Sequence, residues 1–189
     1  MRQTICLLIF SLALGVAASA QEMKHGGYAG EEGRAIKSLS AEEVEQLLNG
    51  HGMGLAKAAE LNHYPGPRHV LELGEQLQLT PAQRASAQAA FERMRDEAVR
   101  LGRQIVERER ELDAMFARAD IDAGRLRATT NGIAVLQGEL RAAHLAAHLE
   151  MRRLLSPVQI KRYDELRGYS GGAAKQTSTQ PAAHGNHKH

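Results

Sequence analysis

Two five-residue stretches decide the fold of this chain: Leu79-Thr80-Pro81-Ala82-Gln83 and Leu155-Ser156-Pro157-Val158-Gln159. In both, a hydroxyl residue occupies the N-cap position and proline occupies the first helical position. Glutamine stands where the reciprocal hydrogen bond of a capping box requires it. Helices are therefore expected to begin at Pro81 and at Pro157, and the second is expected to end near Arg167.

The residues between these two starts predict a pair of long helices. Apolar side chains recur at three- and four-residue steps, which is the pattern of helices packed side by side. Asp120-Ile121-Asp122 separates the two stripes, and either aspartate can serve as an N-cap. A short turn makes the pair an antiparallel hairpin. The first stripe comprises Phe91, Met94, Ala98, Leu101, Ile105, Leu112 and Met115, with Arg108 filling one position; the second comprises Leu126, Ile133, Leu136, Leu140, Ala143, Ala147 and Leu154.

Shorter helices are expected before the hairpin. Ser40 and Glu43 form a capping box, and Gly50 ends the helix that follows. A second short segment covers residues 55–61 and stops at the breaker of residues 62–67, and a third covers residues 69–77. The predicted fold class is all-α: a long antiparallel helical hairpin with short N-terminal helices and a short C-terminal helix.

The chain ends indicate export. Residues 1–20 combine Arg2, a short apolar run and Ala18-Ser19-Ala20, which is typical of a cleaved secretory signal peptide. An uncleaved N-terminal anchor is the alternative. Residues 21–38 are expected to be a flexible segment, residues 39–169 the helical domain, and residues 170–189 a disordered tail that contains histidines. After cleavage no integral membrane segment is expected.

Composition excludes several classes of function. The net charge of +2 is too small for a nucleic-acid-binding protein. Gly50-His51-Gly52-Met53-Gly54 is not a dinucleotide-binding motif, because no strand precedes it and the third glycine is misplaced. No catalytic motif was found, so the chain is not expected to be an enzyme.

The paired Leu-[Thr/Ser]-Pro-x-Gln stretches, in a helical chain with a signal sequence, resemble the LTxxQ motifs of the Spy/CpxP family of periplasmic chaperones and related heavy-metal sensor and resistance proteins. The resemblance covers residues 39–169. It implies a periplasmic protein, a helical hairpin with flanking helices, and often a homodimer. It also implies one of two roles: a metal-binding stress or sensor protein, with a membrane-bound signalling partner, or an ATP-independent chaperone that binds unfolded envelope proteins.

Four residues are the candidate metal ligands. His144 and His148 are four apart on one helix face and suit a divalent transition metal such as Zn²⁺, Cu²⁺, Ni²⁺ or Co²⁺. His69, which follows the breaker, is the candidate third ligand, and Glu72 lies one turn later. Glu60 and Met151 are weaker reserve ligands, and they are expected to be a surface and a core residue, respectively. The alternative is that the two helical histidines are only polar residues at the edge of the seam.

The resemblance bears on these ligands. Metal sensors of the family use an early His-x-x-x-His pair, a glutamate and a late His-x-x-x-Met pair. Only the late pair has a counterpart here, with His148 in place of methionine, and there is no early pair.

Two features concern possible partners. Leu145 and Leu149 fall off the main stripe, so they must pack against the N-terminal helices or against a second subunit, and a homodimer is expected. A chaperone would instead use a face that is rich in arginine, although a run of charges is usually just a solvated surface. The arginines in question are Arg93, Arg95, Arg100, Arg103, Arg108 and Arg110.

Overall fold

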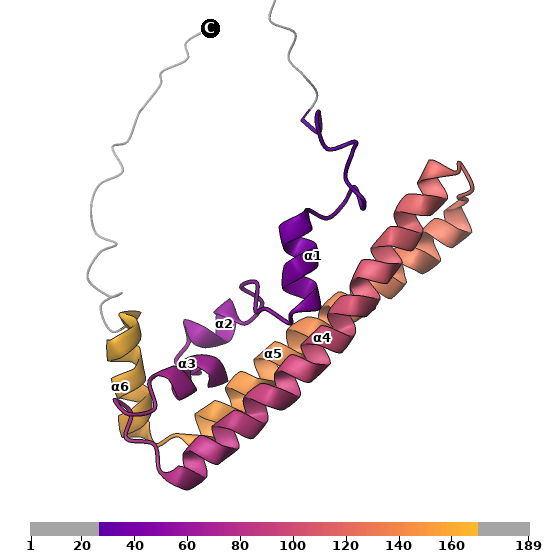
Figure 1. Cartoon of the computed structure of the whole chain (residues 1–189). Helices are drawn as coiled ribbons and strands as arrows, with labels where there is room; N and C mark the ends of the chain where they lie inside the picture. Colours follow the sequence, from indigo (N-terminus) through magenta and orange to yellow (C-terminus); the bar gives the residue numbers. More distant parts are fainter. Residues whose placement is uncertain (1–26, 170–189) are drawn as a thin grey trace, which may run out of the picture. The chain divides into compact units, whose positions relative to one another are not determined.

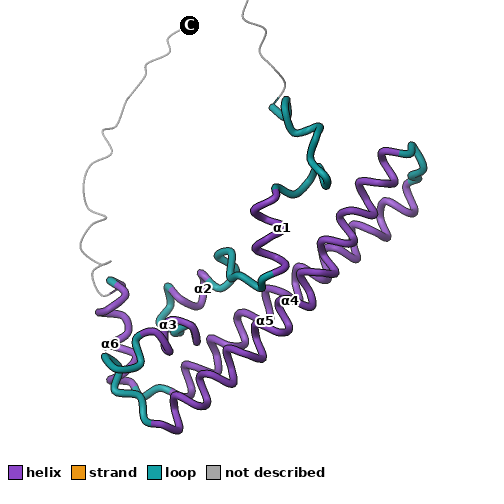
Figure 2. The backbone as a smooth tube through the Cα atoms, in the orientation of Figure 1, coloured by secondary structure: helices purple, strands orange, loops and turns teal. Residues whose placement is uncertain are grey.

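The computed structural model describes residues 27–169, so the expected signal peptide and the tail from residue 170 onward lie outside the described residues. The chain divides between Glu32 and Gly33 into two compact units. Helices account for all the regular structure of the described part, which contains no strand (Figure 1; Figure 2). They are α1 (Ala41–Leu48), α2 (Lys57–Glu60), α3 (Pro67–Glu72), α4 (Pro81–Ala117), α5 (Ala123–Leu154) and α6 (Pro157–Arg167). The predicted all-α class is confirmed.

The hairpin of α4 and α5 is the long element of the fold (Figure 2). Thr80 caps α4 through a complete capping box with Gln83. Of the two candidate N-caps in the turn, Asp122 is the one used, and its side chain accepts a hydrogen bond of 2.9 Å from the backbone N–H of Arg125. α5 runs without interruption through Thr129-Thr130-Asn131-Gly132, a stretch of residues with low helix propensity.

The two glutamines of the decisive motifs bind each other. The side-chain amide of Gln83 donates to Oε1 of Gln159 at 3.0 Å and to the carbonyl of Leu154 at 3.1 Å. In return, Gln159 donates to Oε1 of Gln83 at 3.0 Å and to the carbonyl of Leu77 at 3.1 Å. Each glutamine oxygen also accepts from the N-cap backbone of its own helix. This reciprocal contact, the glutamine clasp, joins the start of α4 to the start of α6.

The short N-terminal helices follow one another along one side of the hairpin (Figure 1). α1 has the predicted capping box between Ser40 and Glu43, and its buried Leu47 faces α4. A Cβ on Gly102 of α4 would lie 2.0 Å from the carbonyl oxygen of Leu47, so only glycine permits this approach. Ile36, which precedes α1, is 3% exposed and belongs to the same core, so the packed part of the chain begins before Leu39.

Two predicted short segments have different bounds from those expected. α2 covers only Lys57–Glu60, because its N-cap position is Ala56, which makes no side-chain capping hydrogen bond, and Gly54 before it has a φ of +75°. α3 begins at Pro67 rather than His69, since proline fits the first helical position. It ends at Glu72, and Gln78, beyond its end, has a φ of +51°.

The core consists of two apolar clusters at different heights of the hairpin. One contains Ala87 and Ala90 of α4, Met151 of α5 and Leu155 at the C-cap of α5, together with Tyr163 and other residues of α3 and α6. The other contains residues 98, 101, 105 and 106 of α4, Leu140 of α5, and Leu47 and Ile36. Between these levels, Phe91, Met94 and Arg95 of α4 and His144 and His148 of α5 line a cavity. Among the described residues, no helix is long and apolar enough to span a bilayer.

Candidate metal centre

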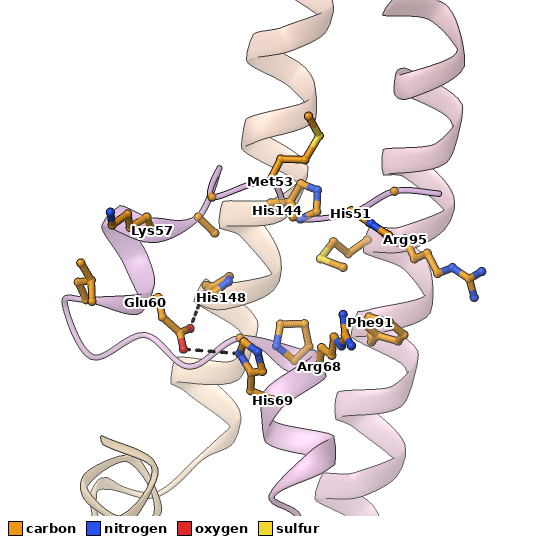
Figure 3. A pocket seen from close by; sticks show the side chains of 18 of the residues that line it. His51, Met53, Lys57, Glu60, Arg68, His69, Phe91, Arg95, His144 and His148 are labelled. Atoms are coloured by element: carbon orange, nitrogen blue, oxygen red, sulfur yellow. Dashed lines mark ion pairs between the residues drawn. The ribbon is translucent and has the colours of Figure 1, made fainter. Parts of the chain in front are cut away.

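A cavity of about 610 Å³ lies between the two apolar clusters and contains most of the candidate ligands (Figure 3). Its lining residues come from the loops before α2 and α3, from α2 and α3, from the first half of α4, from the last third of α5 and from the segment after α6. They include His51, Met53, Lys57, Glu60, Gly66, Arg68, His69, Phe91, Met94, Arg95, His144, His148 and Tyr169. We refer to it as the central pocket.

The predicted pair His144 and His148 lies in this pocket. The two side chains are one helical turn apart on α5, and both are buried, with exposed fractions of 3% and 8%. Nδ1 of His148 lies 2.7 Å from the carbonyl oxygen of Tyr64, a contact in which the imidazole must be the donor. A histidine that donates one ring N–H to a backbone carbonyl keeps its other nitrogen, here Nε2, as the potential metal ligand.

His144 has an unused ligand atom. Its Nε2 is buried and has no hydrogen-bond partner in the part of the chain that the structure describes. Burial lowers the pKa of His144 below its ordinary value, and the nearby His148 lowers it further. Both effects favour a neutral imidazole, the form that binds metals. A buried polar atom without a partner is costly unless something fills the site.

Glu60 is the centre of the polar network, so the expectation of a surface residue was wrong. Its Oε1 accepts hydrogen bonds from the hydroxyls of Tyr163 at 2.5 Å and Tyr169 at 3.1 Å. The same oxygen lies 3.4 Å from Nε of Arg167. Burial alone would raise the pKa of Glu60, but hydrogen bonds from His69, Tyr163 and Tyr169 and the charge of His148 lower it to about 2. Glu60 is therefore a carboxylate at any ordinary pH.

The structure brings His69 to this network and leaves Glu72 outside it. Nδ1 of His69 lies 3.6 Å from Oε1 of Glu60, and Nδ1 of His148 lies 3.6 Å from Oε2 of the same carboxylate (Figure 3). Glu72 instead forms an exposed ion pair of 2.9 Å with Arg68. The acidic group that joins the histidines is thus Glu60. Met151, as expected, is a core residue, 1% exposed.

Gly66 fits the breaker segment onto α5. A Cβ at this position would lie 2.9 Å from Cε1 of His148 and 3.4 Å from Oε2 of Glu60. The glycine between two prolines therefore does more than interrupt a helix, because it lets the backbone pass close to the imidazole. His51 and Met53 were missed as pocket residues, and Glu60 was only a reserve ligand, since no local periodicity links these residues to α5.

The donor types fit a transition metal, although their present positions do not close around one. Within residues 27–169, no three His, Cys, Asp or Glu side chains are placed to hold one ion. Two ligands of a tetrahedral ion lie about 3.3–3.5 Å apart, given metal–ligand distances of about 2.0–2.1 Å. The separations at Glu60 are close to this value, but its Oε1 is occupied by the tyrosines, and only its Oε2 has no hydrogen-bond partner among the described residues. Metal binding here requires side chains to rotate.

The arginine face is largely neutralised by acidic neighbours. Arg93 pairs with Glu150, Arg100 with Glu97, Arg108 with Glu111, and Arg110 with Glu107. Most of these side chains are half exposed, and ion pairs of this kind contribute little to stability. The run is thus a solvated surface for the most part.

A model of the heavy-metal resistance family matches residues 54–162. The matched span includes Glu60, His69, His144 and His148, and begins just after Met53. No curated protein and no solved structure is similar enough to match the chain. The resemblance drawn from the paired motifs is confirmed by this match. The chain therefore belongs to the heavy-metal resistance family, within the Spy/CpxP-like group.

Proposed function

We propose that this protein is a periplasmic heavy-metal-binding stress or sensor protein without catalytic activity, and that it binds a transition metal ion in the central pocket through His144 and His148. The observation that carries the proposal is the buried Nε2 of His144, which lines the pocket without a hydrogen-bond partner. A second imidazole stands one turn away and is already oriented by the Tyr64 carbonyl. Membership of the heavy-metal resistance family supports the same conclusion.

His69 and Glu60 complete the polar wall of the site. His69 is a further imidazole in the pocket lining, and its Nδ1 and that of His148 each lie 3.6 Å from an oxygen of Glu60. When bound, the ion supplies positive charge that its ligands and neighbours must accommodate. The chain's own residues position the imidazoles, keep them neutral and shield them from bulk water.

The test is calorimetric titration of the mature protein with Zn²⁺, Cu²⁺ and Ni²⁺, with melting curves at each metal concentration. Replacing both His144 and His148 with Ala should abolish stoichiometric binding and the metal-induced rise in melting temperature. Affinity should fall steeply below about pH 5.5, because protons compete for imidazoles whose reference pKa is about 6.5.

His63→Ala is the matched control. His63 is 58% exposed at its side chain, lies outside the pocket and pairs with Asp164. This variant should bind metal like the parent. If the His144/His148 double variant still binds one ion with unchanged affinity, the pocket is not the site. Deleting residues 170–189, with their histidines, should change neither affinity nor the melting shift.

The competing function is that of a chaperone that needs no metal. Exposed apolar side chains on the hairpin favour it: Phe116 is 56% exposed and Val135 is 59% exposed. An aggregation-suppression assay on an unfolded client separates the two functions. Suppression by the double histidine variant, equal to that of the parent and in the presence of a chelator, would support the chaperone.

A further inference from the structure

The central pocket contains two methionines in addition to its histidines. Met53 lies in the loop before α2, and Met94 lies on α4; both line the pocket with His144 and His148. In Figure 3 Met53 is drawn at the same end of the pocket as His144 and His51, away from Glu60 and His69. Met53 has a φ of +45°, a left-handed backbone conformation that is uncommon for residues other than glycine. Thioether sulfur is therefore one of the ligand types that the pocket offers.

Among the described residues that line the pocket, Glu60 is the only acidic one, and it lies at the end away from Met53 and His144 (Figure 3). Its Oε1 accepts from Tyr163 and Tyr169, whereas its buried Oε2 has no hydrogen-bond partner and lies 3.6 Å from Nδ1 of His148. The donors at the other end are uncharged: the imidazole of His144 and the thioether of Met53, with the thioether of Met94 also in the lining.

The basic residues that line the pocket do not decide the charge of the ion. Lys57, Arg68 and Arg95 are all exposed, and Arg68 also pairs with Glu72, so solvent screens their charges. The ligand types do favour a monovalent ion, since thioethers select Cu(I) over harder divalent ions.

We propose, building on the function proposed above, that the ion of the central pocket is a soft monovalent cation, Cu(I) or its analogue Ag(I), bound by the imidazoles of His144 and His148 and by the thioethers of Met53 and Met94. The unpartnered Nε2 of His144, buried in the pocket wall, is the atom around which this site is built. His69 and Glu60 then belong to its surroundings, where they orient His148 and the end of α6.

The experiment compares the affinity of the full mature chain for Ag(I), for Cu(I) under anaerobic conditions and for Zn²⁺, each by competition with a chromophoric chelator. His184, His187 and His189 are replaced with Ala in every sample, so that these histidines do not contribute to the measured binding. The variant Met53→Leu/Met94→Leu conserves volume and removes both sulfurs. It should weaken Ag(I) and Cu(I) binding by about tenfold or more and leave Zn²⁺ binding unchanged.

The chain provides a matched control. Met115 and Met151 are buried in the core, 3% and 1% exposed, and do not line the pocket. Met115→Leu/Met151→Leu should leave Ag(I) affinity within about a factor of two of the parent, since Leu and Met exchange at little cost. With methionine methyl groups labelled for NMR, Ag(I) should shift the signals of Met53 and Met94 and leave those of Met115 and Met151 unchanged.

Two results would overturn the inference: equal Ag(I) affinity in the parent and in Met53→Leu/Met94→Leu, or tighter binding of Zn²⁺ than of Cu(I) by the parent. Either leaves the proposed function intact, provided that the histidines are required for binding. Failure of the proposed function looks different, because then no metal binds the pocket with stoichiometry and the His144/His148 double variant behaves like the parent.

Discussion

Glu60 connects three parts of the chain that are remote in sequence. Its carboxylate contacts His69 beyond the breaker, His148 on α5, and Tyr163, Arg167 and Tyr169 at the end of the domain. Burial raises the pKa of Tyr163, and its hydrogen bond to Glu60 raises it further, so this hydroxyl remains a donor at all ordinary pH values. A single side chain thus ties α6 to the wall of the central pocket.

The acid sensitivity of the metal-free protein should depend on this residue. The folded-state pKa of Glu60 is about 2, below its ordinary value of 4.5, so the unfolded chain takes up the proton more readily. The resulting stabilisation is complete above pH 4.5 and is lost as the pH falls toward 2. Glu60→Gln should reduce the free energy of unfolding at pH 7 by up to about 3 kcal/mol. Urea unfolding should show that the difference in free energy of unfolding between the parent and Glu60→Gln becomes smaller as the pH falls from 4.5 toward 2.

Glu72→Gln is the control for this measurement. It removes only the exposed ion pair with Arg68 and should cost less than about 1 kcal/mol. Parallel stability curves for the parent and Glu60→Gln between pH 4.5 and pH 2 would show that the carboxylate does not supply this stabilisation.

At the scale of elements, the glutamine clasp explains why both decisive motifs end in glutamine. A carboxylate is enough for a lone capping box, as Glu43 of α1 shows. Only an amide can accept from its own N-cap and also donate to a second helix, as Gln83 and Gln159 both do. The two motifs look like independent helix starts in the sequence, but in the folded protein they bind each other through these glutamines.

Glutamate at positions 83 and 159 tests the glutamine clasp separately from helix capping, because it can accept a hydrogen bond but cannot donate one. Gln83→Glu/Gln159→Glu keeps both capping-box acceptors, loses the donors and places two carboxylates together, so the free energy of unfolding should fall by about 2–4 kcal/mol at pH 7. Each single variant should cost less than half of this, because one amide still donates. The measurement is chemical denaturation of all three variants.

Glu43→Gln is the control for this measurement, and it should change the free energy of unfolding by less than about 0.5 kcal/mol. A double glutamate variant that is as stable as the parent would rule out the clasp.

α1 can pack closely on α4 only because residue 102 of α4 is a glycine, which has no side chain. Gly102→Ala would place a methyl group 2.0 Å from the Leu47 carbonyl, which is backbone and cannot rotate away. α1 should therefore detach, lowering the melting temperature by several degrees despite the higher helix propensity of alanine. Hydrogen exchange should increase in α1 and not in α6.

Gly138→Ala on α5 is the matched substitution, because nothing lies within 4 Å of its missing Cβ. It should stabilise the protein by about 0.5–1 kcal/mol. The α1 attachment is misassigned if both alanine variants melt at or above the parent temperature.

At the scale of the whole molecule, the sequence could predict what depends on near neighbours. Caps, the turn at Asp122 and the bounds of α6 follow from a few adjacent residues, and the structure confirms them. The central pocket depends on contacts across 84 to 109 residues, such as those of Tyr64 with His148 and of Glu60 with Tyr169. The periodicity of the sequence does not indicate such long-range contacts. Glu72 was therefore preferred to Glu60 as the candidate acidic ligand. His69 could be anticipated because the breaker before it reverses the chain.

The expected homodimer stays a prediction at this scale. Leu149 is 46% exposed on α5, so the N-terminal helices do not cover it within the described chain. Leu149→Glu should shift the protein from dimer to monomer, since burying a carboxylate in an apolar interface is costly. Light scattering across a concentration series measures this change. Val158→Glu, at a position of α6 that is 78% exposed, should leave the mass unchanged. A monomeric parent would remove the basis for this prediction.

The long-range contacts of Glu60 also set the order of events during folding. The hairpin joins neighbours through a short turn, whereas Glu60 must meet Tyr163 across 103 residues. Contacts between near neighbours form before those that close long loops. The hairpin is then the early part of the molecule and the central pocket the late one, because the chain must be present as far as Tyr169 before the network closes. An ion that bound there would distinguish complete chains from partly made ones, because it would stabilise only chains in which this network has closed.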